Sequence, residues 1–128
     1  MIDIAGEEVR LTMPATPPLL RVARLTAAGL ASRLGFSFDE IEDVKIAVDE
    51  LCFALVGSKG RAGTLTVVYH LSDDELRIDG EGDFGTDGAE PAPSDLSAQI
   101  LAAVVDEHSV TRDGDITRFH LLKRRGNG

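Results

Sequence analysis

The sequence predicts an α+β fold, a two-layer sandwich in which helices cover one face of a mostly antiparallel mixed sheet. Apolar and polar residues alternate, as in half-buried strands, in five segments: 9–13, 65–71, 76–79, 108–112 and 116–122. Apolar residues recur every three or four positions, as in amphipathic helices, in three segments: 19–34, 38–56 and 95–104. The order strand, helix, helix, strand, strand, helix, strand, strand suits one layer of each kind.

Prolines separate the first strand from the first helix. Apolar residues alternate over Val9–Met13, and Pro14 ends this strand. Pro17 and Pro18 suit the start of the helix that follows, because the first helical turn leaves its N–H groups unpaired in any case. Gly35 is the expected C-terminal cap of this helix.

The second helix has the clearest start signal. Ser37 and Glu40 match a capping box, in which each side chain reaches the backbone N–H of the other residue. Acidic residues crowd the first turns, where the helix dipole favours negative charge. Gly57 and Gly60 end the helix. One apolar stripe lies between these limits, formed by Ile41, Val44, Val48, Leu51, Cys52 and Leu55.

The second half of the chain contains two hairpins and a helix. The strands at 65–71 and 76–79 are joined by a short polar turn, which predicts an antiparallel hairpin. Gly80–Pro93 is rich in Gly, Asp and Pro and is predicted to be a loop. Ser94 or Asp95 caps the third helix. The last hairpin turns at Asp113–Gly114, a strong turn signal, and residues 123–125 begin a short frayed tail.

Composition limits the class of protein. The 128 residues fit one domain spanning 1–128, and the net charge of −9 argues against binding to nucleic acid or to an anionic membrane. The single cysteine excludes an internal disulfide. No apolar run approaches the about 20 residues of a membrane span, and Met1–Val9 lacks the pattern of a signal peptide. We therefore expect a cytoplasmic protein.

The cysteine and the histidines allow both a chemical and a structural interpretation. Cys52 lies on the apolar stripe with no histidine near it in sequence, which favours a core thiol over a nucleophile. His70, His108 and His120 lie on three predicted strands and could in principle form a zinc site. Solvent-facing strand histidines are the more common arrangement, so no metal site is predicted.

Three strings carry a family resemblance. Ile46–Val56, IAVDELCFALV, looks like the N box of a family of kinases, written as Glu, three residues, then Asn. The proline-rich entry to the first helix, with Leu20–Val22, looks like the start of that family's partner-binding region, and Val104–Glu107 before the last hairpin is also similar. From about Val9 to Lys123 the chain thus resembles the anti-sigma factor serine kinases of the RsbW and SpoIIAB type. The resemblance implies the histidine-kinase/Hsp90-like ATPase fold.

The sequence departs from this family at its nucleotide-binding elements. In the family, the N-box Asn holds Mg²⁺ and the Glu positions the attacking hydroxyl. Glu50 is present, but Ala54 stands where the Asn belongs and offers no oxygen to the metal. The adenine-binding Asp would fall at Gly82, so that Asp79, Gly80 and Gly82 match the family's cofactor-binding motif only out of register.

The phosphate-binding elements are also altered. Acids occur throughout Gly80–Gly88, where they would repel phosphate, and the segment Pro93–Ser97 lacks the glycines that close over it in the family. We therefore expect an ATP site that does not function. Glu50 would then be a vestigial catalytic residue on an acidic helix, and Asp79 an outward-facing strand residue.

The resemblance implies a bacterial transcription regulator of stress-response type. It would bind a sigma factor, an anti-anti-sigma antagonist of the STAS type, or both, by partner switching, with Arg21 and Arg24 as contacts and with pairing into a homodimer. No cofactor is expected. The alternative is an active ATP-dependent protein-serine kinase that phosphorylates the antagonist. Mg-ATP would then bind, Glu50 would orient the hydroxyl, and Asp49 or Asp79 would replace the missing Asn. A structural subunit without a regulatory role is a more remote class.

Overall fold

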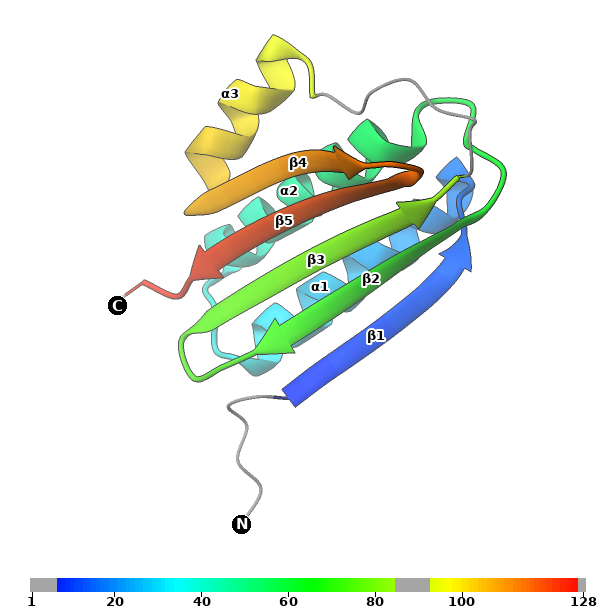
Figure 1. The fold of residues 1–128 in the computed structure, drawn as a ribbon. Helices are drawn as coiled ribbons and strands as arrows, with labels where there is room; N and C mark the ends of the chain where they lie inside the picture. Colours follow the sequence, from blue (N-terminus) through cyan, green and yellow to red (C-terminus); the bar gives the residue numbers. More distant parts are fainter. Residues whose placement is uncertain (1–6, 85–92, 127–128) are drawn as a thin grey trace.

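The computed structural model describes residues 7–84 and 93–126, and it is an α+β sandwich (Figure 1). Its sheet has the strand order β1-β2-β3-β5-β4, and all four pairings are antiparallel. The fold class predicted from the sequence is confirmed, with a fully antiparallel sheet among the described residues. The strands are β1 (Glu7–Pro14), β2 (Thr64–Leu71), β3 (Glu75–Asp83), β4 (Glu107–Asp113) and β5 (Ile116–Arg124).

The helices lie on one face of the sheet (Figure 1). A 3-10 turn, η1 (Pro17–Leu19), leads into α1 (Leu20–Arg33), which is followed by α2 (Phe38–Val56) and later by α3 (Asp95–Val104). The helix α2 packs against both α1 and α3 and against the central strands. None of the helices in the described residues is long and apolar enough to cross a membrane.

The core forms between the helices and the inner face of the sheet. The stripe predicted for α2 is buried there except at Ile41, which is only partly buried. Its other members are at most 1% exposed: Val44, Val48, Leu51, Cys52 and Leu55. The helix α1 buries three alanines at i, i+4 and i+8, which allow it to approach the sheet closely: Ala23, Ala27 and Ala31. The hydroxyl of Tyr69 on β2 donates to the carbonyl of Ala23 at 2.9 Å, so the buried phenol is satisfied.

The predicted loop at Gly80–Pro93 begins too early. Residues 80–83 continue the strand β3, and residues 85–92 lie outside the described part of the chain. The glycines that indicated a loop instead make room for aromatic rings. A Cβ added at Gly80 would lie 2.0 Å from the ring of Phe119, and one at Gly82 would lie 2.3 Å from the ring of Phe84. Tertiary packing thus overrides the low strand propensity of glycine.

The predicted frayed tail is also wrong. The strand β5 extends to Arg124, and the side chains that follow its apolar segment are engaged with the helix layer. Lys123 donates to the carbonyl of Val104 at 2.7 Å and pairs with Asp43 at 3.3 Å, while Arg125 donates to the carbonyl of Leu34 at 3.0 Å. These basic residues satisfy carbonyls at helix ends, which sequence periodicity does not reveal.

The capping box of α2 is confirmed. Ser37 Oγ accepts from the backbone N–H of Glu40 at 3.1 Å, and the Glu40 carboxylate accepts from the backbone N–H of Ser37 at 2.8 Å. The other Glu40 oxygen accepts from the backbone N–H of Gly126 at 2.6 Å. These bonds stabilise the ionised form of Glu40 and so lower its pKa, and the bond from Ser37 has the larger effect.

We predict that Ser37→Ala lowers the free energy of unfolding by about 1 kcal/mol, the usual effect of losing an N-cap. Glu40→Gln removes the charge and one of the two acceptor oxygens, much as protonation of the carboxylate does, so its effect should depend on pH. The folded-state pKa of Glu40 is lowered, so its charge stabilises the fold above the unfolded pKa and ceases to do so as the pH falls through the folded pKa. Urea titrations at about pH 7 and about pH 3 should therefore show that the free energies of unfolding of the wild type and Glu40→Gln converge at acid pH. A difference that grows at acid pH would contradict this assignment.

Candidate functional site

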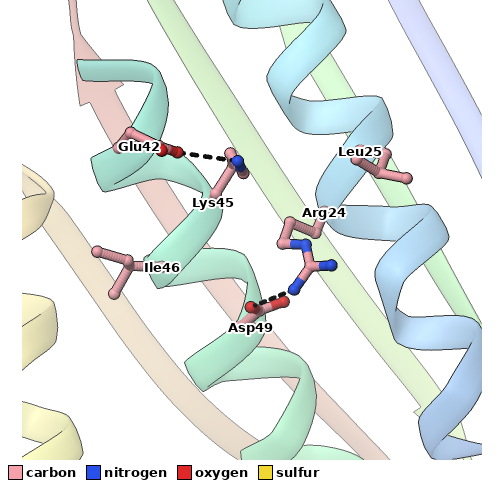
Figure 2. Close-up of a pocket in the computed structure, with 6 residues that line it drawn as sticks. All are labelled: Arg24, Leu25, Glu42, Lys45, Ile46 and Asp49. Atoms are coloured by element: carbon pink, nitrogen blue, oxygen red, sulfur yellow. Dashed lines mark hydrogen bonds and ion pairs between the residues drawn. The ribbon is translucent and has the colours of Figure 1, made fainter. Parts of the chain in front are cut away.

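The outer surface of α1 and α2 carries an open pocket of about 300 Å³ (Figure 2). Two ion pairs lie in it: Arg24 with Asp49 at 3.0 Å, and Lys45 with Glu42 at 2.9 Å. Its remaining lining residues, Leu25 and Ile46, are apolar and 57% and 42% exposed. The pocket therefore combines charged groups that are paired with one another and apolar side chains that remain about half exposed.

A second open pocket, of about 270 Å³, adjoins the first and shares Arg24 and Asp49 with it. The prolines of η1 and the half-exposed ring of Phe53 also line it. Arg21 lies at its edge, is exposed, and makes no ion pair with any residue of 7–84 or 93–126. The structure thus brings together Arg21 and Arg24, the two predicted partner contacts. That they bind a partner stays a prediction.

A third pocket, of about 280 Å³, contains Glu50. It lies where the end of α2 meets the start of α3. Ser94 caps α3 by accepting from the backbone N–H of Ser97 at 3.1 Å, and the hydroxyl of Ser97 donates to the Glu50 carboxylate. Ala54 lines the same pocket with a methyl group only. The predicted catalytic carboxylate is therefore engaged with the first turn of α3.

The three residues predicted for cofactor binding do not face the same side of the sheet. Asp79 lies on the face opposite the helices, where it contacts His120 Nδ1 at 2.8 Å, His70 Nε2 at 3.2 Å and Arg77 at 3.4 Å. Gly80 and Gly82 are buried and share the opposite face of the strand, which is the face toward the core. Asp79 thus has the outward orientation that the strand alternation indicates, and the sheet separates it from Glu50.

The sequence did not identify Phe84 and Arg61, which pack against one another near Gly82. Phe84 is 5% exposed and its ring packs over Gly82. The Arg61 guanidinium lies 5.7 Å from the centroid of this ring, within cation–π distance, and its Nε donates to the carbonyl of Leu55 at 2.8 Å. The available signal was the spacing of Gly82 and Phe84, because residues two apart on a strand share a face. Phe84 occupies the space that a longer side chain at position 82 would need.

The histidines are distributed over both faces. His70 and His120 share the Asp79 carboxylate on the open face, whereas His108 pairs in register with the buried Leu121 on the helix side. Within residues 7–84 and 93–126, no group of three or more His, Cys, Asp or Glu is arranged to hold a metal ion. The three histidines therefore do not form the zinc site considered from the sequence.

Cys52 is a core thiol in the structure. It is fully buried, and burial raises its pKa to about 12, with a smaller contribution from the Asp49 charge. A thiol that stays protonated at neutral pH is a poor nucleophile.

Comparisons with known proteins agree with this fold and with the family resemblance. No protein-family model matches the chain. The chain is 41% identical over 73 residues to the serine-protein kinase RsbW of Halalkalibacterium halodurans, covering 56% of this chain and 45% of that protein. It is 40% identical over 74 residues to the serine-protein kinase RsbW of Bacillus cereus, covering 56% of this chain and 46% of that protein. The chain thus spans about half the length of the curated relatives it matches.

A solved structure extends the comparison over nearly the whole chain. The crystal structure of the RsbU and RsbW domains of a Mycobacterium tuberculosis protein matches with a TM-score of 0.71 and 19% identity, covering 93% of this chain and 32% of that one. This similarity shows that the chain shares the fold of that RsbW-domain structure. The sequence matches support the resemblance to the RsbW/SpoIIAB-like anti-sigma factor kinases over about half of the chain.

We predict that Ser97→Ala loosens the start of α3. The variant removes the hydroxyl that joins α3 to Glu50 on α2, and a partly exposed bond to a charged group contributes about 1 kcal/mol. Amide hydrogen exchange in the first turns of α3 should speed up by about fivefold at that free energy. Ser109→Ala, an exposed serine on β4, is the matched control and should change nothing. Unchanged exchange in Ser97→Ala would show that this bond does not hold α3.

Proposed function

We propose that this protein is an anti-sigma-factor-like regulator that binds a sigma factor, an anti-anti-sigma antagonist, or both, by partner switching, without a functional ATP site. The observation that most supports this proposal is the identity of about 40%, across roughly half of the chain, to proteins named serine-protein kinase RsbW. The proposal includes a bacterial cytoplasmic setting and pairing into a homodimer.

The surface of α1 and α2 supports the binding half of the proposal. Arg21 is an exposed cation without an ion pair among the described residues, on a protein whose net charge is −9. It lies beside the half-exposed ring of Phe53. Arginine next to an aromatic side chain is the composition typical of residues that dominate protein–protein binding energy.

Three features support the loss of ATP binding. Ala54 offers no oxygen to Mg²⁺, which requires oxygen ligands in near-octahedral geometry. Glu50 is engaged with Ser97, at the point where the family's flexible lid would begin. Phe84 fills the inner side of the sheet beside Gly82, the position where the adenine-binding Asp would stand. Metal, lid and adenine contact are thus all affected.

An active protein-serine kinase is the second candidate, because the Glu50 carboxylate still lines an open pocket. The structure gives limited support to the proposed substitutes for the missing Asn. Asp49 is paired with Arg24 on the outer surface of the helices, and Asp79 lies on the other side of the sheet. Nucleotide binding distinguishes the two candidates.

We predict that isothermal titration of this protein with ATP and Mg²⁺ gives no binding in the micromolar range, because metal, lid and adenine contacts are altered together. Ala54→Asn restores the oxygen and should not restore binding, since Phe84 and the Glu50–Ser97 bond remain. A dissociation constant near 1 μM, or about −8 kcal/mol, in either protein would overturn this half of the proposal and favour the kinase.

We predict that Arg21→Glu weakens the complex with the host sigma factor or antagonist by about 2 kcal/mol, or roughly 30-fold in Kd, if Arg21 is a central contact. The partner is first recovered with the tagged wild-type chain from the native host and identified by mass spectrometry. Arg10→Glu on β1, exposed on the edge strand of the sheet, is the matched control. Equal binding by wild type and Arg21→Glu would remove Arg21 from the interface.

A further inference from the structure

We propose that the two adjoining pockets on the outer surface of α1 and α2 form one groove that binds an amphipathic helix of a partner protein. The bound helix would present an apolar stripe to the groove, an acidic edge to α1 and a basic edge to α2. The inference deepens the proposed function and rests on it only for the existence of a protein partner.

The apolar stripe has a counterpart in the groove. Leu25 on α1 and Ile46 on α2 are 57% and 42% exposed in the first pocket, and Phe53 is 52% exposed in the second. Single exposed apolar residues are common, but these three line two pockets that share Arg24 and Asp49. In the first pocket, Leu25 and Ile46 lie on opposite sides of the Arg24–Asp49 ion pair (Figure 2). Such a surface matches the i, i+3, i+4 and i+7 side chains of a docked helix.

The two sides of the groove have opposite charge. Among the residues that line the two pockets, α1 contributes the cations Arg21 and Arg24, whereas α2 contributes Glu42 and Asp49 with one lysine. An incoming helix of uniform charge would be attracted to one side and repelled by the other. One with an acidic and a basic edge is complementary to both, as paired charges are at the edges of coiled-coil interfaces.

Arg24 gives a further reason for an acidic group above α1. Its Nη1 donates to Asp49 at 3.0 Å, but its buried Nε has no hydrogen-bond partner among the described residues. Leaving a buried donor unpaired is unfavourable. A partner carboxylate that draws the guanidinium outward could accept hydrogen bonds from two of its N–H groups, since arginine binds carboxylates in a bidentate manner.

The test uses three synthetic helical peptides of 18 residues with the same leucine stripe. One has a glutamate edge and a lysine edge, one has lysine on both edges, and one has glutamate on both. A helix can lie in the groove in either direction, so exchanging the two edges would not serve as a control. We expect the mixed peptide to bind at least tenfold more tightly than either uniform peptide in fluorescence titrations. The lysine peptide measures the general attraction to an acidic protein.

The groove variants locate the binding. Leu25→Ser with Ile46→Ser should reduce binding of the mixed peptide at least tenfold, and Leu96→Ser, an exposed leucine on α3, should not. All are surface changes, and thermal melts verify that the variants fold. Equal binding of the mixed and lysine peptides, or no loss in the double variant, would overturn the proposal without affecting partner switching. A light-scattering mass of twice 13.7 kDa that halves in the double variant would show instead that a second copy occupies the groove.

Discussion

The burial of one face of α2 is the constraint on which the rest of the structure depends. Its inner residues are almost completely enclosed between the sheet and the two neighbouring helices. Because a helix has fixed periodicity, committing Val48 and Cys52 to the core also fixes the direction of Ile46, Asp49, Glu50 and Phe53. The outer groove and the Glu50 pocket are therefore consequences of the same packing. A shift of α2 along its axis would alter both together.

The packing of the sheet explains why the strand β3 contains two glycines. Gly80 and Gly82 leave no side chain on the inner face of β3, and the rings of Phe119 and Phe84 take that space. Arg61 then stacks on Phe84 and reaches the carbonyl of Leu55 near the end of α2. The inner face of β3 at positions 80 and 82 is thus part of the hydrophobic core, and a larger side chain at either position would displace packed aromatic surface.

Local signals allowed most of the fold to be predicted. The capping box at Ser37 and the periodicity of α2 depend on residues close together in sequence, and both were confirmed. The errors at Gly80–Asp83 and at the C-terminal basic residues have one cause. Their conformations depend on contacts with residues distant in sequence, such as Gly80 with Phe119 and Arg125 with Leu34. The candidate site was harder for the same reason: Glu50 was found from a motif, but its bond to Ser97 joins two helices whose relative position no local pattern encodes.

The contacts of the C-terminal residues also affect how the chain folds as it is synthesised. Gly126 donates to Glu40, 86 residues earlier, and Lys123 pairs with Asp43 at the start of α2. The strand β5 lies between β3 and β4, although it follows both of them in the sequence. A nascent chain therefore exposes an unpaired edge of β3 until β5 has been synthesised. Such non-local closure slows folding and exposes the edge to aggregation, so nascent chains of this protein should depend on chaperones more than a domain with sequential strand order would.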